Sequence, residues 1–289
     1  MLVVLALQGA LSIEALGTDA NLYRFAASSY LAGDDPWNRA GGDWAVFQFA
    51  GLPPTILAFV PFAFLPEPIV MALWVALSLA AAILIVRALR LPLYWLLFPP
   101  LVAAVWSGNP HIVAVALLLG RAAFLAPILK IYGAVPLIGE RRWSALLLSG
   151  ALVALTVVAA PGLWRDYLTQ AADVSARLVA QAGPMSAYGF PILMALVAFV
   201  LALLFSRREL GWLAVPALWP GTEFIYSSMA LPVITPVLAT ALAVPFRGSP
   251  VIAIVIAGFV RLIEPRYAGL YRALRDRDVG VWSRWFRAK

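Results

Sequence analysis

The sequence predicts an all-α, polytopic integral membrane protein, and its composition and uncharged runs carry this prediction. Of its 289 residues, 63% are apolar and 12% are charged, whereas soluble proteins carry about 25% charged residues. The uncharged runs 68–86, 143–164, 178–206 and 224–246 suit a hydrocarbon core that needs about 20 apolar residues. These runs are continuous rather than alternating, which favours helices over a barrel of strands.

The first 90 residues predict two helices around a long polar stretch, followed by a further crossing. Residues 1–16 are expected to form a short first helix, because they lack the basic start and A-x-A-like cleavage site of a signal peptide. The polar stretch 17–51 is expected to form an external loop. Five prolines between residues 53 and 68 predict a kinked helix or a pair of short ones, and residues 69–86 predict a full crossing.

The rest of the chain alternates apolar runs with breaks. An apolar run over 91–106 ends at the turn-like SGNP of 107–110. The segment 111–138 fits either two short helices or one long tilted helix. Residues 164–182 have mixed polarity at helical spacing, which predicts an amphipathic helix at the membrane interface. The remaining apolar segments follow in chain order at 143–160, 188–205, 211–218, 231–245 and 250–260.

The basic residues predict orientation rather than nucleic-acid binding. The net charge is +7, and eight of the 21 Lys and Arg residues lie between Arg261 and Lys289, which suits an anionic lipid surface. We therefore divide the chain into a membrane domain, 1–262, and a basic amphipathic tail, 263–289.

Positive charge prefers the cytoplasmic side of a cell membrane. We therefore expect the arginine pairs 87 and 90, 141 and 142, and 207 and 208 to face inward with the tail. If every apolar run crossed the membrane once, these arginine pairs and the tail could not all face inward. At least one proline-rich segment is therefore expected to be re-entrant. The run lengths predict roughly eight to ten transmembrane helices of a multi-pass protein, with the cytoplasmic membrane of a prokaryote as the expected location.

Several kinds of chemistry are excluded by residue type. The chain has no cysteine and one histidine, so disulfides, thiol catalysis and Cys- or His-based metal clusters are not expected. It also lacks a Gly-rich phosphate loop, HExxH and GxSxG.

The acidic residues after the first segment are the first candidates for chemistry. A carboxylate held at the membrane boundary, as expected for Asp19, can accept a proton from a hydroxyl, although a solvated loop aspartate fits the position too. Asp34 and Asp35 precede Pro36, where a turn is the simplest explanation. As neighbours they fit a divalent cation or a sugar hydroxyl as well.

Two cations lie in an otherwise apolar stretch. Charge within a membrane is costly enough that function is the default interpretation, and Arg121 and Lys130 fit a phosphate of a lipid carrier. The alternative is a tight turn at Arg121 and a Lys130 side chain that reaches the interface.

Two further polar positions remain open to more than one interpretation. His111 follows Asn109 at a helix start, which suits an anion or simply marks the entry of the helix. Glu223 is the only charge between Leu210 and Phe246, and it lines a polar cavity or sits at an interface.

Five segments together resemble the multi-spanning GT-C glycosyltransferases, most closely the polyprenyl-phosphate-mannose-dependent mannosyltransferases of glycosyltransferase family 87. They cover roughly residues 17–240 and read DANLYRFAASSYLAGDDPWN, FAGLPPTILAFVPFAFLP, SGNPHIVAVALLLG, LKIYGAVPLIGERRW and LWPGTEFIYSSMALPVITPVLA. Lys130 falls where such enzymes often have a lysine followed by a proline, and in this chain Ile131 replaces that proline. Residues 107–109 stand where a Gly-Gln or Gly-Asn pair is common.

The resemblance implies transfer of a hexose, with mannose expected, from a polyprenyl-phosphate donor to a glycolipid or glycan acceptor with inversion. Asp19 matches the position of the general base, and Arg121 and Lys130 are assigned to the donor phosphate. Asp34 and Asp35 are assigned to the acceptor or a divalent cation. The candidate substrate-binding set is completed by Tyr23, Asn109, His111 and Glu223.

Two other functions remain open from the sequence. A transporter or lipid flippase also uses broken helices and rare buried charges. A non-catalytic membrane subunit would use its tail to recruit partners or anionic lipid, and would tolerate replacement of Asp19.

Overall fold

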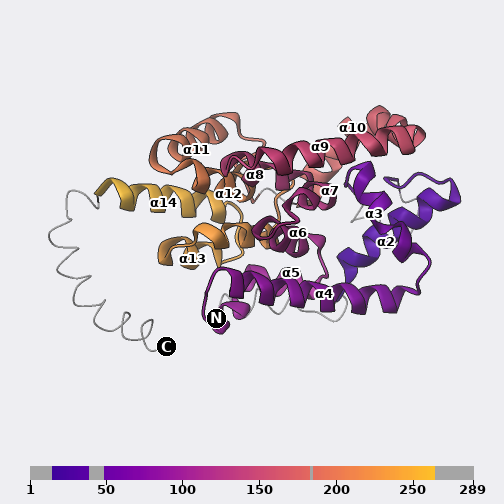
Figure 1. Cartoon of the computed structure of the whole chain (residues 1–289). Coiled ribbons are helices and arrows are strands. Elements are labelled where there is room, and N and C mark those ends of the chain that lie inside the picture. The colour runs from indigo at the N-terminus through magenta and orange to yellow at the C-terminus, as the bar shows by residue number, and fades with distance from the viewer. Residues whose placement is uncertain (1–14, 39–48, 183–184, 264–289) are drawn as a thin grey trace.

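The computed structural model describes residues 15–38, 49–182 and 185–263, and this part of the chain is helical without a strand. The all-α prediction is therefore confirmed for these residues (Figure 1). The predicted first helix, 1–16, lies almost entirely outside them, as does the predicted tail, 263–289.

The expectation of a loop after the first segment was wrong for its first half, where α2 (Thr18–Ala32) forms. Its buried face consists mainly of small residues, including Ala20, Ala26 and Ala27, and α2 packs against α3 (Pro53–Ala63). Small side chains let two helix backbones approach closely. Because the buried side chains of α2 are mostly small, the segment shows no clear apolar stripe. Its polar residues therefore indicated a loop in the sequence.

The proline-rich stretch forms one short helix, α3, that is separate from the following helix. Pro61 lies inside α3, and Pro66 precedes α4 (Glu67–Ala88). Proline is well tolerated in the first turn of a helix, and α4 has a proline there. The crossing predicted over 69–86 is present as this 22-residue helix, which is about 33 Å long at 1.5 Å per residue.

The middle of the chain is more broken than the sequence predicted. A short 3₁₀ helix, η3 (Leu93–Leu97), precedes α5 (Pro99–Trp106), and α5 meets α6 (Pro110–Leu119) at a bend of 120°. The segment expected as one or two helices contains five pieces, because Gly120, Lys130 and Gly133 interrupt it. After α6 these pieces are η4 (Ala123–Leu125), α7 (Ala126–Leu129), η5 (Ile131–Gly133) and α8 (Ala134–Gly139).

The last part of the described chain follows the expected order of helices. The predicted apolar and amphipathic segments are α9 (Trp143–Ala159) and α10 (Pro161–Ala182), which meet at a bend of 104°. The remaining elements are α11 (Pro191–Leu204), α12 (Arg207–Leu218), η6 (Phe224–Val233), α13 (Pro236–Leu242) and α14 (Ser249–Ile263).

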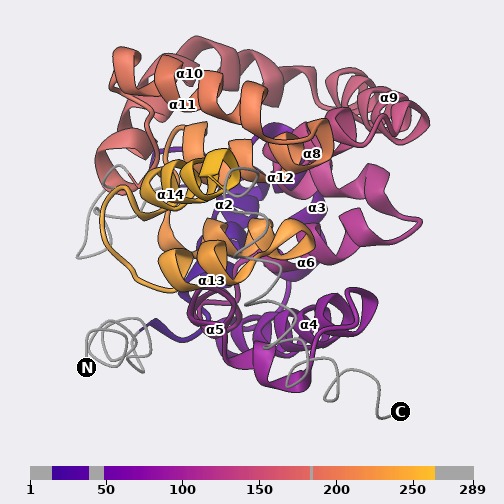
Figure 2. The ribbon, with the colours of Figure 1, turned by 90° about the vertical axis from the view of Figure 1, so that its left-hand side faces the viewer.

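Two clusters of buried apolar side chains form the core of the described residues, a larger one around α6 and α12 and a smaller one around α2 and α3. In Figure 1, α2, α3 and α10 lie toward one end of the molecule, and α11, α13 and α14 lie toward the other. Figure 2 shows α9, α10 and α11 along one side and α4 and α5 along the opposite side, with α6 and α12 between them.

The described residues contain one helix, α4, that is long and apolar enough to cross a membrane. The number rises to three if each of the bent pairs α5–α6 and α9–α10 is one span. The eight to ten crossings expected from the sequence are therefore not confirmed. Large apolar side chains are nevertheless exposed along four helices, for example Leu84 on α4, Leu147 on α9, Ile192 on α11 and Phe259 on α14.

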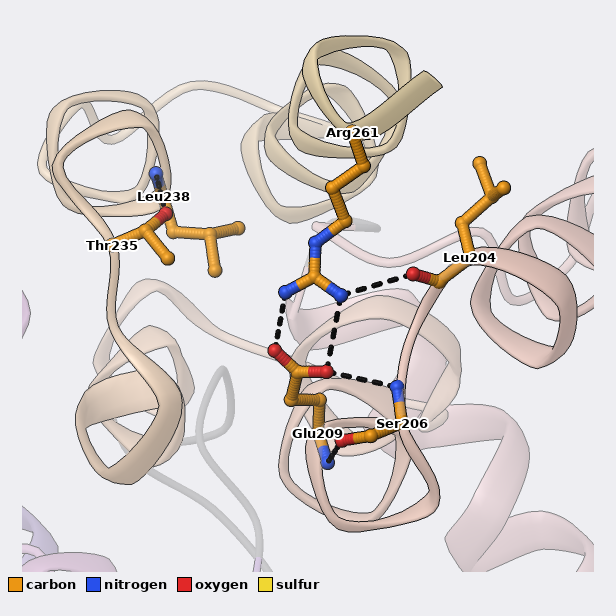
Figure 3. A network of polar contacts seen from close by, with 6 residues as sticks. All are labelled: Leu204, Ser206, Glu209, Thr235, Leu238 and Arg261. Carbon is orange, nitrogen blue, oxygen red and sulfur yellow. Dashed lines mark hydrogen bonds and ion pairs between the residues drawn. The ribbon is translucent and has the colours of Figure 1, made fainter. Parts of the chain in front are cut away.

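A polar network fastens the end of α14 to the start of α12 (Figure 3). The Arg261 guanidinium pairs with both carboxylate oxygens of Glu209 and donates to the Leu204 carbonyl at 2.9 Å. Ser206 and Glu209 form a reciprocal capping box at the first turn of α12. Burial raises the pKa of Glu209, but the hydrogen bonds from Arg261 and Ser206 outweigh it, so the net pKa is lowered.

Two of the predicted arginine pairs meet near this network. Arg208 pairs with Glu140 at 3.3 Å, and Arg207 donates to the Ile138 carbonyl at 3.0 Å. The start of α12 and the end of α8 are thus adjacent, which brings residues 141–142 and 207–208 to the same region of the molecule. The inward orientation expected for both pairs stays a prediction.

Candidate functional site

The first turn of α2 is docked on the break between α5 and α6. The amide of Gly17 donates to the Trp106 carbonyl at 2.9 Å, and the amide of Asp19 donates to the Ser107 carbonyl at 3.1 Å. Gly17 and Gly108 both have positive φ, at 69° and 64°, where glycine carries no steric penalty. A Cβ on Gly17 would lie 2.6 Å from the Cβ of Met71 on α4, so this junction requires glycine.

The Asp19 carboxylate is oriented by the cap of α6. Asn109 donates from Nδ2 to Asp19 Oδ2 at 2.8 Å, and Asn109 Oδ1 accepts from the His111 backbone amide at 2.9 Å. The carbonyl oxygen of an asparagine side chain can only accept. Asn109 therefore has a fixed orientation, with its NH₂ group facing Asp19.

Lys130 lies at the break between α7 and η5, in extended backbone conformation. Its Nζ lies 3.4 Å from the Tyr226 hydroxyl and 5.0 Å from the centroid of the Tyr23 ring. The Thr55 hydroxyl of α3 donates to the Ile128 carbonyl at 2.9 Å, which anchors the chain just before the lysine. Aromatic faces attract a cation at such distances.

Asp19, Asn109 and Lys130 all line one cavity of about 220 Å³. Five of the nine residues predicted from the sequence are in its wall, namely Asp19, Tyr23, Asn109, Lys130 and Glu223. They come from α2, the α5–α6 break, the α7–η5 break and the segment before η6. The cavity thus forms where α2 meets three interruptions of regular helix.

Two carboxyl groups and one ammonium group line this cavity. Burial raises the pKa of Glu223, the Asp19 charge raises it further, and Lys130 opposes both. Glu223 therefore takes up a proton closer to neutral pH than an ordinary glutamate does. Asp19 also lies in the first turn of α2, where the helix dipole favours negative charge.

Asp34 and Asp35 lie in a second cavity of about 590 Å³, between the end of α2 and the α9–α10 junction. Asp35 accepts from the Trp37 amide at 2.9 Å and from Gln170 Nε2 at 3.1 Å. This is the bonding pattern of a turn aspartate. The structure therefore separates this pair from Asp19. Over the described ranges, no group of three or more His, Cys, Asp or Glu side chains is arranged to hold a metal ion.

Arg121 and His111 are also placed outside the wall of the Asp19 cavity. Arg121 is exposed in the turn after α6, which matches the tight-turn interpretation of that residue. His111 is fully buried, with its two ring nitrogens 2.9 Å from the Tyr132 hydroxyl and 2.8 Å from Ser228 Oγ. Both ring nitrogens therefore have partners inside the protein, and the structure places His111 behind the wall of the cavity instead of in it.

Sequence reasoning missed the aromatic wall of the cavity. Tyr132, Tyr167, Trp219 and Tyr226 all line it, but aromatic residues in apolar segments resemble ordinary core. A signal was present in their neighbours. Tyr132 precedes Gly133, and Trp219 precedes Pro220 and Gly221, so both lie beside residues that break helices.

The cavity wall contains groups of three chemical kinds. A carboxylate can take a proton from a hydroxyl, an ammonium group can hold a phosphate, and aromatic rings provide apolar faces with polar edges. No protein-family model, curated protein or solved structure matches this chain.

Proposed function

We propose that this protein is a membrane-embedded glycosyltransferase of the GT-C type. It transfers a hexose, with mannose the first to test, from a polyprenyl-phosphate donor to a glycolipid or glycan acceptor with inversion. The observation that carries the proposal is that Asp19 and Lys130, which are far apart in the sequence, line one cavity.

The roles follow from the chemistry of an inverting displacement. Asp19 takes the proton of the acceptor hydroxyl while its oxygen attacks the anomeric carbon. The bond between that carbon and the phosphate oxygen breaks on the opposite face, and its electron pair leaves with the phosphate. The Lys130 ammonium stabilises the charge that develops on this leaving group. Arg121 is exposed in its turn, so Lys130 alone is assigned to the phosphate.

The surface of the molecule supports a lipid-borne substrate. The helix α4 is long and apolar enough to cross a bilayer, and apolar side chains are exposed on α4, α9, α11 and α14. Large apolar side chains exposed along whole helices are typical of contact with lipid or a partner. A donor with a polyprenyl tail would share that environment.

The test is transfer of labelled mannose from polyprenyl-phosphate-mannose to membrane lipid extract by the purified protein. We expect Asp19→Asn to lower the rate by about 10²–10⁴-fold, which is the usual contribution of a general base. Asp166→Asn is the matched control, because it makes the same change at an exposed aspartate outside the cavity, and it should retain the rate. Transfer that survives Asp19→Asn would remove Asp19 from the mechanism. Absence of transfer in the parent protein would reject the proposal for this donor.

A transporter of a lipid-linked sugar is the second candidate. The observation that favours it is the α5–α6 pair, which is bent by 120° and borders the cavity at Asn109, because transporters build binding sites at broken helices. Proteoliposomes loaded with labelled polyprenyl-phosphate-mannose, with and without an acceptor, separate the two functions. Movement of the intact donor between leaflets without an acceptor supports transport. A new glycosylated product that forms only when the acceptor is present supports transfer.

A further inference from the structure

His111 lies in the first turn of α6, directly behind the cavity wall. It is the only histidine of the chain, and it is fully buried. Its ring touches two tyrosines that line the cavity: Nδ1 is 2.9 Å from the Tyr132 hydroxyl, and the Tyr226 ring packs edge-to-face on it with centroids 5.0 Å apart. The residue thus joins α6, η5 and η6 without reaching the cavity itself.

The direction of each hydrogen bond around His111 can be assigned. The Ser228 hydroxyl donates to the Ile225 carbonyl at 2.7 Å, which uses its one proton, so it accepts from His111 Nε2. A neutral imidazole carries one N–H, so Nδ1 accepts and the Tyr132 hydroxyl donates. A neutral ring fits this position because burial of an unpaired charge is costly.

Both tyrosines held by His111 border Lys130. The Tyr226 hydroxyl accepts from Lys130 Nζ at 3.4 Å, and the same Nζ lies 5.7 Å from the Tyr226 ring centroid. Tyr132 follows Lys130 by two residues and packs edge-to-face on Tyr226, with centroids 5.0 Å apart. The position of the ammonium group therefore depends on two rings that His111 fixes from behind.

We propose that His111 is a positioning residue that sets the place of the Lys130 ammonium in the cavity through Tyr132 and Tyr226. The catalytic consequence rests on the proposed function, in which Lys130 holds the donor phosphate. Loss of His111 then weakens donor binding although His111 never touches the substrate. The positional part can be measured without any transfer assay.

The chain offers a direct readout, because its only lysines are Lys130 and Lys289. In a Lys289→Arg background, mass spectrometry of the Lys130 peptide after amine acylation reports the reactivity of this single lysine at each pH. We expect His111→Phe and Tyr132→Phe to raise its rate about threefold or more at a given pH, since loss of one hydrogen bond changes an equilibrium by such factors.

Two further variants separate positioning from general damage. His111→Asn keeps an acceptor for the Tyr132 hydroxyl, so it should restore most of the parental reactivity. Ser149→Ala removes another buried hydroxyl, which donates to the Phe124 carbonyl, and should leave Lys130 unchanged. If His111→Phe does not fold, Tyr132→Phe carries the test, because it keeps the ring.

Parental Lys130 reactivity in folded Tyr132→Phe and His111→Phe would overturn the proposal. If transfer is present, we also expect the donor KM of His111→Phe to rise more than kcat falls. If the two variants alter Lys130 reactivity but the parent protein shows no transfer, the positioning role is supported and the proposed function is rejected.

Discussion

Asn109 shows how one side chain connects the fold with the candidate chemistry. Its oxygen caps α6 and its NH₂ group donates to Asp19. These two roles use different ends of the same amide, so they can be separated by a substitution that keeps one and reverses the other.

We predict that Asn109→Asp keeps the α6 cap but impairs transfer and lowers stability. Aspartate is as good a helix cap as asparagine, but here it places a second carboxyl group beside Asp19 at a position that is 3% exposed, so the melting temperature should fall. The amide donor to Asp19 is also lost, and we expect transfer to fall about tenfold or more. Rates and thermal unfolding measured on the same samples check this. A parental transfer rate would show that the Asn109 bond does not orient Asp19 for reaction.

At the scale of elements, the sequence predicted the long apolar helix α4 well and the breaks between the other segments poorly. The helix α4 extends the predicted range 69–86 by only two residues at each end. The prediction succeeded here because a long run of apolar residues within one segment is enough to indicate a helix. The helix α2 was missed because its buried face is made of alanines. The site depends on contacts between breaks, such as Asp19 with Asn109, and composition does not encode which breaks meet. Only the resemblance to a family brought Asp19 and Lys130 together in advance.

We predict that Gly17→Ala destabilises the junction of α2 with the α5–α6 break. Left-handed backbone costs a non-glycine residue about 1–2 kcal/mol, and overlap with Met71 adds about 1–3 kcal/mol. Gly33→Ala is the matched control, because Gly33 has φ of 81° but nothing within 4 Å of an added Cβ. Thermal unfolding of both variants in detergent measures the difference. Equal losses of stability would show that the contact with Met71 is easily relieved.

The Glu209–Arg261 network makes the α12–α14 pair sensitive to acid. The pKa of Glu209 is lowered in the folded state, so its contribution is complete above its ordinary value of 4.5 and is lost as the pH falls through the lower folded value. We expect Glu209→Gln to weaken the dependence of unfolding on pH in this acidic range. Glu67→Gln, at an exposed position on α4, should keep the parental dependence. An unchanged pH profile in Glu209→Gln would contradict the assignment.

At the scale of the whole molecule, charge and cavities are separated along its length. The helix α9 leads away from the arginine-rich region at residues 141–142 and 207–208, and it ends at the second cavity with Asp34 and Asp166. Its 17 residues span about 25 Å, close to the thickness of a hydrocarbon core. The positive-inside preference therefore predicts that the arginines face the cytoplasm and that both carboxylates face outside.

We predict that Arg208→Cys and Asp166→Cys react with a membrane-impermeant thiol reagent from opposite sides of sealed vesicles. The natural chain contains no cysteine, so each variant carries a single thiol and needs no altered background. Asp34→Cys is the internal check and should label from the same side as Asp166→Cys, because these residues line one cavity. Labelling of Arg208→Cys and Asp166→Cys from one side would reject this orientation.

The docking of α2 on the α5–α6 break also sets an order of events during synthesis. The carbonyl groups at the end of α5 accept hydrogen bonds from the amide groups at the start of α2. The first turn of α2 therefore depends on a helix end that lies much later in the chain. When α2 leaves the ribosome, the partners of its first turn have not yet been made. The proposed base acquires its place only after Asn109 has emerged, and a nascent chain that stops before residue 107 holds Asp19 without a site.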